Sequence, residues 1–168
     1  INNFGGFYRT WVYVHEARRF GATIELPCVN MSRYKTTIYG TDIYIGGGFT
    51  DVTDNGNVLN EADYIARWDG TAWHARGSNG AMDGWINGEV LAIAINGNDV
   101  YIGGNFLDVN NNDNPLDAGD YVARWDGKKW NSLSGGLNYG VRTIAVSPNA
   151  SGGSDVYAGG GFINAGGV

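Results

Sequence analysis

The chain repeats itself at a nearly constant interval. The stretch Asp42-Ile-Tyr-Ile-Gly-Gly-Gly-Phe49 returns with few changes at residues 99–106 and 155–162, and these stretches begin 57 and 56 residues apart (99 − 42 and 155 − 99). A second stretch, Tyr64-Ile-Ala-Arg-Trp-Asp-Gly-Thr-Ala-Trp73, returns at residues 121–130. A fixed period of this size is typical of one supersecondary unit stacked on copies of itself. Because every unit must pack, packing is the simplest explanation for residues that recur in every unit.

Four short strands are predicted in each unit. In residues 90–95, large aliphatic side chains alternate with alanines, which is the period-two pattern of a strand, and residues 141–146 match this segment. The next strand, residues 99–104, follows an Asn-Gly pair that favours a tight hairpin. It ends in a Gly-Gly pair, which we expect where another backbone passes too close for a Cβ atom. Residues 121–125 are the third strand, and an Asp-Gly turn leads into a fourth strand around Trp130.

Only the connections between the predicted strands change in length. Trp73 precedes Val90 by 17 residues, whereas Trp130 precedes Val141 by 11 residues. Constant strands joined by variable loops are typical of a repeat scaffold, and loops are where scaffolds often carry function. Four antiparallel strands per unit predict an all-β fold of the β-propeller type, in which each unit is one four-stranded antiparallel blade.

The order of these landmarks resembles the kelch repeat. It runs Tyr-Ile-Gly-Gly-x-Phe, then Ala-Arg-Trp-Asp-Gly-x-x-Trp, then a Gly-rich turn and Val-x-x-Ile-Ala-Val. It is most similar to repeats of large bacterial surface and secreted proteins and of the propeller domains of fungal cortical polarity markers. The resemblance covers roughly residues 35–168 and implies a propeller of kelch-like blades. It implies little about function, since propellers serve binding, scaffolding and catalysis alike.

Residues 34–168 are therefore predicted to be propeller repeats, amounting to about two to three blades. A propeller ring needs at least ~4 blades, so we expect further blades from flanking sequence or from other copies of the chain. We also expect the chain to be a piece of a longer polypeptide. Residues 1–33 contain neither landmark and are predicted to be either a diverged blade or a neighbouring segment.

Composition argues against several kinds of partner and site. The formal net charge is −6, which disfavours binding to the phosphate backbone of a nucleic acid. No apolar stretch is long enough to span a bilayer. Cys28 is the only cysteine, which excludes an internal disulfide and a multi-cysteine metal site. His15 and His74 are the only histidines, and no metal-site or catalytic-triad spacing surrounds them.

Two aligned polar loops are candidates for calcium binding. Residues 51–57 and 108–114 carry oxygen-bearing side chains (Asp, Asn or Thr) at alternate positions, and an Asp follows each loop at the same offset. Calcium prefers oxygen ligands, which alternate residues of a tight loop can supply. No bidentate Glu closes either loop, however, and an Asx-rich turn that satisfies its own backbone is the alternative interpretation. The candidate ligands are Asp51, Asn55, Asp63, Asp108, Asn112 and Asp120.

A third candidate site lies in the unrepeated segment of residues 74–87. It contains Trp85 among glycines, together with His74, Arg76 and Asp83. An exposed Trp beside polar groups would suit a sugar-binding subsite, because the apolar face of a sugar stacks on an aromatic ring. The alternative is that Trp85 folds back on its own loop, which is favoured by how often Trp is largely buried.

Charged residues that recur are expected to be structural. Arg67 and Arg124 occupy one position of the third strand, whereas an active-site arginine would be expected only once. We therefore expect each arginine to make a hydrogen bond or ion pair between neighbouring blades. Asp69 and Asp126 recur in the same way and are predicted to be turn residues.

The predicted function is that of a non-catalytic propeller module of a larger protein, secreted or located at the cell surface. Such a module serves adhesion, scaffolding or protein interaction, and its partner is a protein or a glycan. One alternative is a lectin-like propeller, for which Trp85 is the distinct support. Another is a propeller glycosidase or lyase, which needs a convergent pair of carboxylates, whereas the acidic residues here lie mostly in repeated turns or loops. A cytosolic kelch-type adaptor is disfavoured by the resemblance to surface repeats.

Overall fold

Strands make up all the regular structure in the described part of the chain. The computed structural model describes residues 35–39, 42–76, 85–111, 114–116, 118–133 and 135–165. They belong to one unit, residues 33–168, whereas the other unit, residues 1–32, lies outside the described residues, as does the predicted segment 1–33. The described part contains twelve strands and no helix. The prediction of an all-β fold is therefore confirmed.

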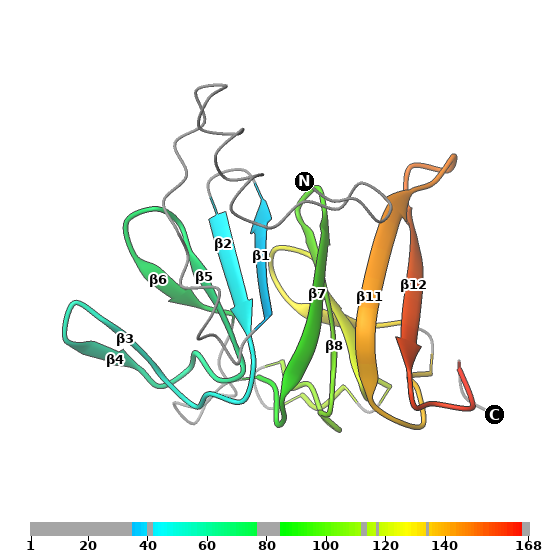
Figure 1. Cartoon of the computed structure of the whole chain (residues 1–168), viewed down its shortest axis with the longest axis horizontal. Helices are drawn as coiled ribbons and strands as arrows, with labels where there is room; N and C mark the ends of the chain where they lie inside the picture. Colours follow the sequence, from blue (N-terminus) through cyan, green and yellow to red (C-terminus); the bar gives the residue numbers. More distant parts are fainter. Residues whose placement is uncertain are drawn as a thin grey trace, which may run out of the picture. The chain divides into compact units, whose positions relative to one another are not determined.

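Four strands form the first antiparallel sheet, in the order β1-β2-β5-β6 (Figure 1). They are β1 (Lys35–Tyr39), β2 (Asp42–Gly46), β5 (Ile65–Trp68) and β6 (Trp73–Ala75). Cross-strand pairing places Tyr44 of β2 opposite Arg67 of β5. The turn between β5 and β6 contains Gly70, whose φ of 99° lies in the left-handed region that glycine adopts without strain.

The second sheet follows the same chain order and the same register. Its order is β7-β8-β9-β10, with β7 (Val90–Asn96), β8 (Asp99–Gly104), β9 (Val122–Trp125) and β10 (Trp130–Ser132). Tyr101 lies opposite Arg124, as Tyr44 lies opposite Arg67 in the first sheet. The predicted hairpin between β7 and β8 is confirmed, but its two central residues are 97 and 98 rather than the Asn-Gly pair, because Asn96 already pairs with Asp99.

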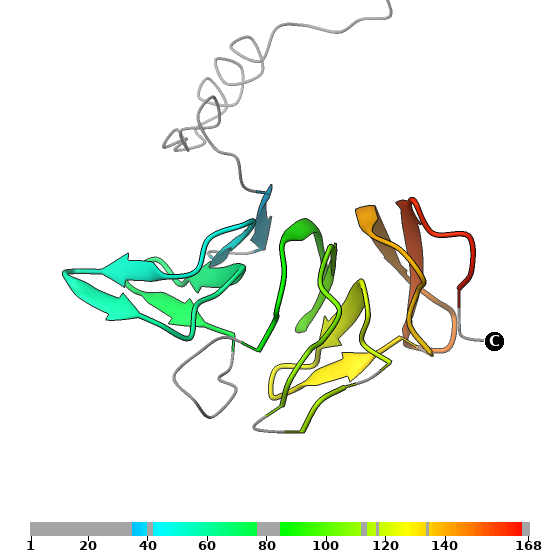
Figure 2. The same cartoon turned by 90° about the horizontal axis from the view of Figure 1, so that it is seen from below.

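Two hairpins complete the described strands. β11 (Val141–Pro148) pairs with β12 (Ser154–Gly160), and β3 (Val52–Asp54) pairs with β4 (Asn57–Leu59). The β3–β4 hairpin lies in the connection between β2 and β5, where the sequence predicts a polar loop. β11 packs against β7 and β8 of the second sheet (Figures 1 and 2).

Neighbouring sheets approach each other closely at the Gly-Gly pairs. A Cβ atom added to Gly46, at the end of β2, would lie 2.6 Å from Val90 Cγ1 at the start of β7. A Cβ atom on Gly103 of β8 would overlap Val141 at the start of β11. Because the following sheet occupies the space that a side chain would need, each of these positions requires glycine. This confirms the prediction that the Gly-Gly pairs mark a close approach.

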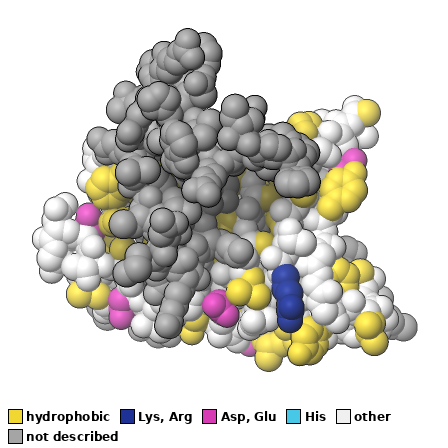
Figure 3. All heavy atoms as spheres, viewed as in Figure 1, with side chains coloured by type: hydrophobic (Ala, Val, Ile, Leu, Met, Phe, Trp, Pro, Cys, Tyr) yellow, Lys and Arg dark blue, Asp and Glu magenta, His cyan; other side chains and the backbone are white. Residues whose placement is uncertain are grey.

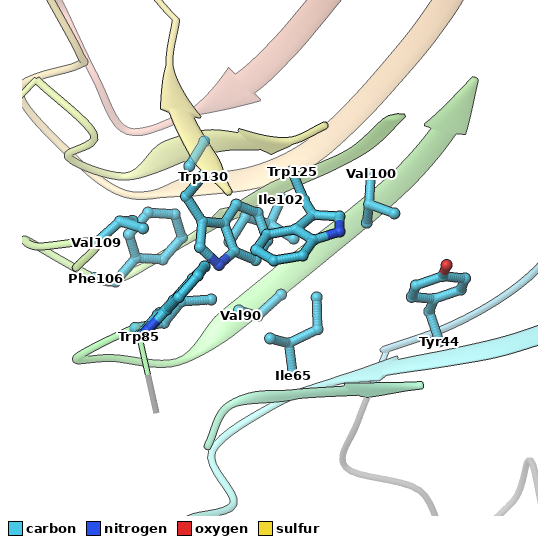
Figure 4. Packing of buried hydrophobic residues seen from close by; sticks show 12 residues of the cluster. Tyr44, Ile65, Trp85, Val90, Val100, Ile102, Phe106, Val109, Trp125 and Trp130 are labelled. Atoms are coloured by element: carbon cyan, nitrogen blue, oxygen red, sulfur yellow. The ribbon is translucent and has the colours of Figure 1, made fainter. Parts of the chain in front are cut away.

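The hydrophobic core draws on both four-stranded sheets and centres on aromatic rings (Figure 4). Trp125 of β9 packs against Trp130 of β10 and against Trp85, with ring centroids 5.5 Å and 5.3 Å apart. Trp130 and Phe106 are fully buried. Aromatic side chains bury a large apolar area. In the second sheet, the Trp after the Ala-Arg pair (Trp125) and the Trp after the Asp-Gly turn (Trp130) therefore pack in the core.

The described sheets do not close into a ring. Their arrangement as blades around a common axis stays a prediction, and so does the assignment to kelch-like repeats. Among the described residues, no helix has the length and apolar character that crossing a membrane requires.

Candidate functional site

An Asp–Arg ion pair joins the second and third strands of each four-stranded sheet. Arg67 Nη1 lies 2.7 Å from Asp42 Oδ2, and Arg124 Nη1 lies 3.4 Å from Asp99 Oδ2. The predicted ion pair is confirmed, but the predicted location between neighbouring units is wrong. Arg67 stands opposite Tyr44, so Asp42, two residues earlier on the same face of β2, is its diagonal neighbour within one sheet.

The turn after β9 is stabilised by Asp126. Its Oδ1 accepts hydrogen bonds from the backbone N–H groups of Lys128 and Lys129 at 2.9 Å and 3.0 Å, and its Oδ2 accepts one from Asn131 Nδ2 at 2.9 Å. These bonds, above all the one from Lys129, favour the charged carboxylate and lower the pKa of Asp126 to about 2. The predicted turn role is therefore confirmed.

Asp69 has the same role after β5 and also binds His74. Its Oδ1 accepts hydrogen bonds from the Thr71 hydroxyl at 2.7 Å and from the backbone N–H groups of Thr71 and Ala72 at 2.8 Å and 2.9 Å. Its Oδ2 lies 2.6 Å from His74 Nε2. The hydrogen bonds, led by the one from the Thr71 hydroxyl, lower the pKa of Asp69. His74, a predicted ligand-binding residue, is thus part of the β5–β6 hairpin.

Arg76 connects the two four-stranded sheets. Its Nη2 donates to the Tyr44 hydroxyl at 3.2 Å, and its guanidinium carbon lies 5.2 Å from the ring centroid of Tyr44 and 6.0 Å from that of Trp125. The backbone carbonyl of Arg76 accepts a hydrogen bond from Trp130 Nε1 at 3.1 Å. Burial lowers the pKa of Arg76. Since Leu133 stands at the corresponding place after β10, Arg76 is singular, but these contacts are internal.

Trp85 is a core residue. It is 8% exposed, packs against the Trp125 ring, and has a buried Nε1 that finds no hydrogen-bond partner among the described residues (Figure 4). The alternative that Trp85 folds back on its own loop is right about burial, but the ring packs against Trp125 of β9. An 8% exposed ring leaves no open face on which a sugar could stack. Of the residues predicted for the sugar subsite, Asp83 lies outside the described residues. His74 binds Asp69, whereas Arg76 and Trp85 both contact the Trp125 ring.

The connections after β2 and β8 begin and end at the same backbone hydrogen bonds. Tyr64 N–H donates to Phe49 O at 2.9 Å, and Gly47 N–H donates to Tyr64 O at 3.0 Å. Tyr121 makes the two corresponding bonds in the second sheet, with the same lengths. Tyr64 and Tyr121 have φ values of 60° and 62°, which bulky residues rarely adopt and which the sequence does not reveal. The same two backbone hydrogen bonds therefore anchor both connections, although the loops differ in sequence.

The first calcium candidate coincides with the β3–β4 hairpin. Asn55 and Gly56 have φ values of 48° and 85°, as a two-residue primed turn requires. Asp51 and Asn55 are exposed, whereas Asp63 is buried. Across the described residues, no group of three or more His, Cys, Asp or Glu side chains is placed to hold a metal ion. Calcium binding stays a prediction.

Two asparagines that the sequence analysis did not single out hold the connection between β8 and β9. Asn87 Oδ1 accepts hydrogen bonds from the backbone N–H groups of Leu107 and Asp108 at 2.9 Å and 3.0 Å. Asn111 pairs with the backbone of Trp130: its Nδ2 donates to the carbonyl and its Oδ1 accepts from the N–H, both at 2.9 Å. The run of asparagines at residues 110–112 was the available signal, since Asn often binds backbone in loops.

The second calcium candidate lies in this same connection. Asp108 is exposed, and its Oδ2 accepts a hydrogen bond from Asn87 Nδ2 at 3.0 Å. Asp120 is half-buried, and Asn112 lies outside the described residues. The contact with Asn87 agrees with the alternative of a loop that satisfies its own polar groups.

The connections that follow β2, β8 and β12 leave the sheets at one common edge. The ends of β2 and β8 lie against the starts of β7 and β11. Within the β7–β8 and β11–β12 hairpins, the end of the second strand pairs with the start of the first. In Figure 1, β2 and β12 accordingly end on the same, lower side. We name the described residues of 47–64, 105–121 and 161–165 the loop edge.

Each part of the loop edge exposes a large aliphatic side chain. Val58, Leu107 and Ile163 are 56%, 52% and 87% exposed. Leu107 and Ile163 both follow the recurrent Phe directly. In the space-filling view, hydrophobic side chains reach the surface along the lower side (Figure 3). Asp and Asn residues lie beside these apolar residues in the same connections.

Comparison with models of protein families, with curated proteins and with solved structures found no match. The function is therefore inferred from the residues and geometry of this chain. The resemblance to kelch repeats rests on the repeated residues alone.

Proposed function

We propose that the chain is a non-catalytic β-propeller module of a surface or secreted protein, and that its loop edge binds a protein partner. The observation that carries the proposal is the exposure of Val58, Leu107 and Ile163 in three connections that leave one edge. Removing apolar surface from water on binding contributes roughly 25 cal/mol per Å². The neighbouring Asp and Asn side chains then serve as the polar rim.

The two complete sheets support the propeller architecture. Each has four antiparallel strands in the same chain order, with the Asp–Arg ion pair at the same place. Each packs on the next element through a glycine that leaves no room for a side chain. A ring of at least ~4 blades takes its remaining blades from flanking sequence or from other copies of the chain.

The recurrent charged residues support a role other than catalysis. The Asp and Arg side chains of the second and third strands bind each other, and the Asp of each Asp-Gly turn binds backbone N–H groups. These groups stabilise the sheets, which leaves recognition to the variable loops. The location outside the cell or at its surface is supported by the resemblance to surface repeats.

A protein partner is favoured over a glycan. Sugars bind by stacking on open aromatic rings. The exposed apolar side chains of the loop edge are aliphatic, Trp85 is buried, and the exposed Tyr139 ring beside Gly161 already stacks on Tyr121. Aliphatic side chains complement the apolar surface of a protein partner better than the hydroxyl-rich surface of a sugar.

The test measures binding of the chain to a panel of purified extracellular-matrix glycoproteins and to the same proteins after enzymatic removal of their glycans. Binding is expected to survive deglycosylation. Val58→Asp and Leu107→Asp are each expected to weaken it about tenfold, because a charge placed in a buried apolar contact is costly. Ala150→Asp is the matched control, since Ala150 is exposed in the β11–β12 turn at the opposite edge.

If binding disappears on deglycosylation, the partner is a glycan and the proposal of a protein partner is wrong. Equal affinity of the loop-edge variants and the control variant would place the binding surface elsewhere on the module.

A further inference from the structure

β12 is paired on one side only. β2 lies between β1 and β5, and β8 lies between β7 and β9, whereas among the described strands β12 pairs only with β11. In Figure 1, no described strand lies beyond β12. Within the described part of the chain, the outer side of β12 is therefore a strand edge with unpaired backbone groups, which is a template for a further strand.

The side chains of β12 repeat those of the paired strands but differ in burial. Asp155 and Tyr157 take the places that an Asp and a Tyr hold in β2 and β8. In those strands Tyr44 and Tyr101 are 7% and 2% exposed, whereas Tyr157 is 62% exposed. Asp155 is also exposed and accepts a hydrogen bond from Asn149 Nδ2 at 3.2 Å, where the corresponding residues bind an arginine.

The two complete sheets show which strand such an edge receives. β5 and β9 contain the same Ala-Arg-Trp sequence, and both pair antiparallel with the second strand of their sheet. In both registers the arginine stands opposite the Tyr and forms the ion pair with the Asp two residues earlier. The same register on β12 puts an arginine opposite Tyr157 and beside the carboxylate of Asp155.

We propose that the open edge of β12 binds an extended segment with the sequence Ala-Arg-Trp-Asp-Gly that is not part of these 168 residues. Backbone hydrogen bonds supply the affinity, and the pairing of the arginine with Asp155 sets the register. The inference rests on the blade architecture proposed above. It does not depend on binding at the loop edge, because the two surfaces share no residue.

The test titrates the isotope-labelled chain with a peptide that has the sequence of residues 121–130, followed by nuclear magnetic resonance. Saturable shifts are expected at the backbone amides of β12. The peptide variant Arg124→Glu is expected to bind about fivefold more weakly, which is the upper range for a partly exposed ion pair. The chain variant Asp155→Arg is expected to weaken binding of the unchanged peptide to a similar extent and to prefer the Arg124→Glu peptide.

Asp51→Arg is the matched control, because it makes the same charge change at an exposed Asp of the loop edge. It is expected to leave the peptide affinity unchanged. The peptide variant tests the ion pair even if Asp155→Arg impairs folding.

Absence of shifts at β12 up to millimolar peptide, or equal affinities for the two peptides, would overturn the proposal. A dimer of the chain in which the β12 amides are already protected would make a second copy the occupant, and the proposal would then be wrong. If the peptide does not bind but a protein still binds the loop edge, the proposal for β12 is wrong and the proposed binding function stands.

Discussion

The recurrent charged residues act on their immediate neighbours. Arg67 and Arg124 each bind an Asp on the adjacent strand, and both partners are partly exposed. A pair of this kind contributes about 0.2–1 kcal/mol, so its larger effect is on strand register. A slip of one residue would move the arginine to the other face of its sheet and separate it from the carboxylate.

The pH dependence of stability is expected to report on Asp126. Its pKa in the folded chain is lowered to about 2 from the ordinary value of 3.8. The hydrogen-bonded carboxylate therefore adds stability that is present above the unfolded pKa and is lost as the pH falls through the folded pKa. Asp126→Asn does not titrate, so its free energy of unfolding is expected to change less than that of the unchanged chain between about pH 4 and pH 2.

Urea unfolding at a series of pH values measures this difference. The free energy of unfolding of Asp69→Asn is likewise expected to change less with pH than that of the unchanged chain, because the pKa of Asp69 is also lowered. Asp51→Asn, at an exposed loop position, serves as the control. Parallel pH profiles for Asp126→Asn and the unchanged chain would show that the carboxylate does not stabilise the turn.

Gly46 is expected to be intolerant of a side chain because of Val90. Gly46→Ala is expected to lower the free energy of unfolding by about 1–3 kcal/mol, the usual cost of overpacking. Val90→Ala removes the Cγ1 atom that lies 2.6 Å from the added Cβ. The double variant is therefore expected to be less destabilised than the sum of the single variants.

Chemical denaturation of the four chains of this cycle gives the coupling energy. Gly48→Ala is the matched control, since its added Cβ would meet Glu89 at an ordinary distance of 3.7 Å, and its effect is expected to stay within about 0.5 kcal/mol. Strict additivity of Gly46→Ala and Val90→Ala would mean that the two sheets do not meet at this glycine.

At the scale of the elements, side chains hold the connections in place by making hydrogen bonds that a neighbouring strand would otherwise make. Asn111 binds both the N–H and the C=O of the buried Trp130. Asn111→Ala is expected to lower the free energy of unfolding by about 1–3 kcal/mol, because buried backbone groups would lose their partner. Tryptophan fluorescence during urea unfolding measures the effect. Asn60→Ala, at an exposed position, is the control, and an equal loss in both variants would contradict this role of Asn111.

The elements whose sequence carries a local pattern could be predicted well. The predicted strand at residues 99–104 coincides with β8, and residues 90–95 and 121–125 differ from β7 and β9 by one residue at one end. Alternating apolar side chains and the turn residues beside them are enough to define such strands. The role of the Gly-Gly pairs could also be inferred, because a glycine that recurs at a strand end indicates a close approach.

Features that depend on contacts distant in sequence could not be predicted. Arg76 meets Tyr44 and Trp125 only because two sheets pack together, and Asn87 meets Asp108 across two connections. Burial was the favoured expectation for Trp85, but its contact with the distant Trp125 ring could not be predicted. The exposure of loop residues was likewise hidden, since irregular loops have no periodicity that separates buried from exposed positions.

In the molecule as a whole, one set of recurrent residues assembles the sheets and leaves different surfaces for different tasks. The glycines and the aromatic core hold successive sheets together. We have proposed that a protein partner binds the variable connections of the loop edge and that a further strand binds the outer edge of β12. The central claim is that the recurrent glycines and aromatic side chains stack one sheet on the next.

A map of short proton–proton distances from nuclear magnetic resonance tests this claim most directly. The structure predicts cross-peaks between the Hα protons of Gly46 and the methyl groups of Val90, and between those of Gly103 and the methyl groups of Val141, because each pair is in contact across two sheets. It also predicts cross-strand peaks between β2 and β5 and between β8 and β9 in the same register. Correct peaks within each sheet without the two Gly–Val peaks would show that the sheets do not stack through their glycines, which would contradict the account.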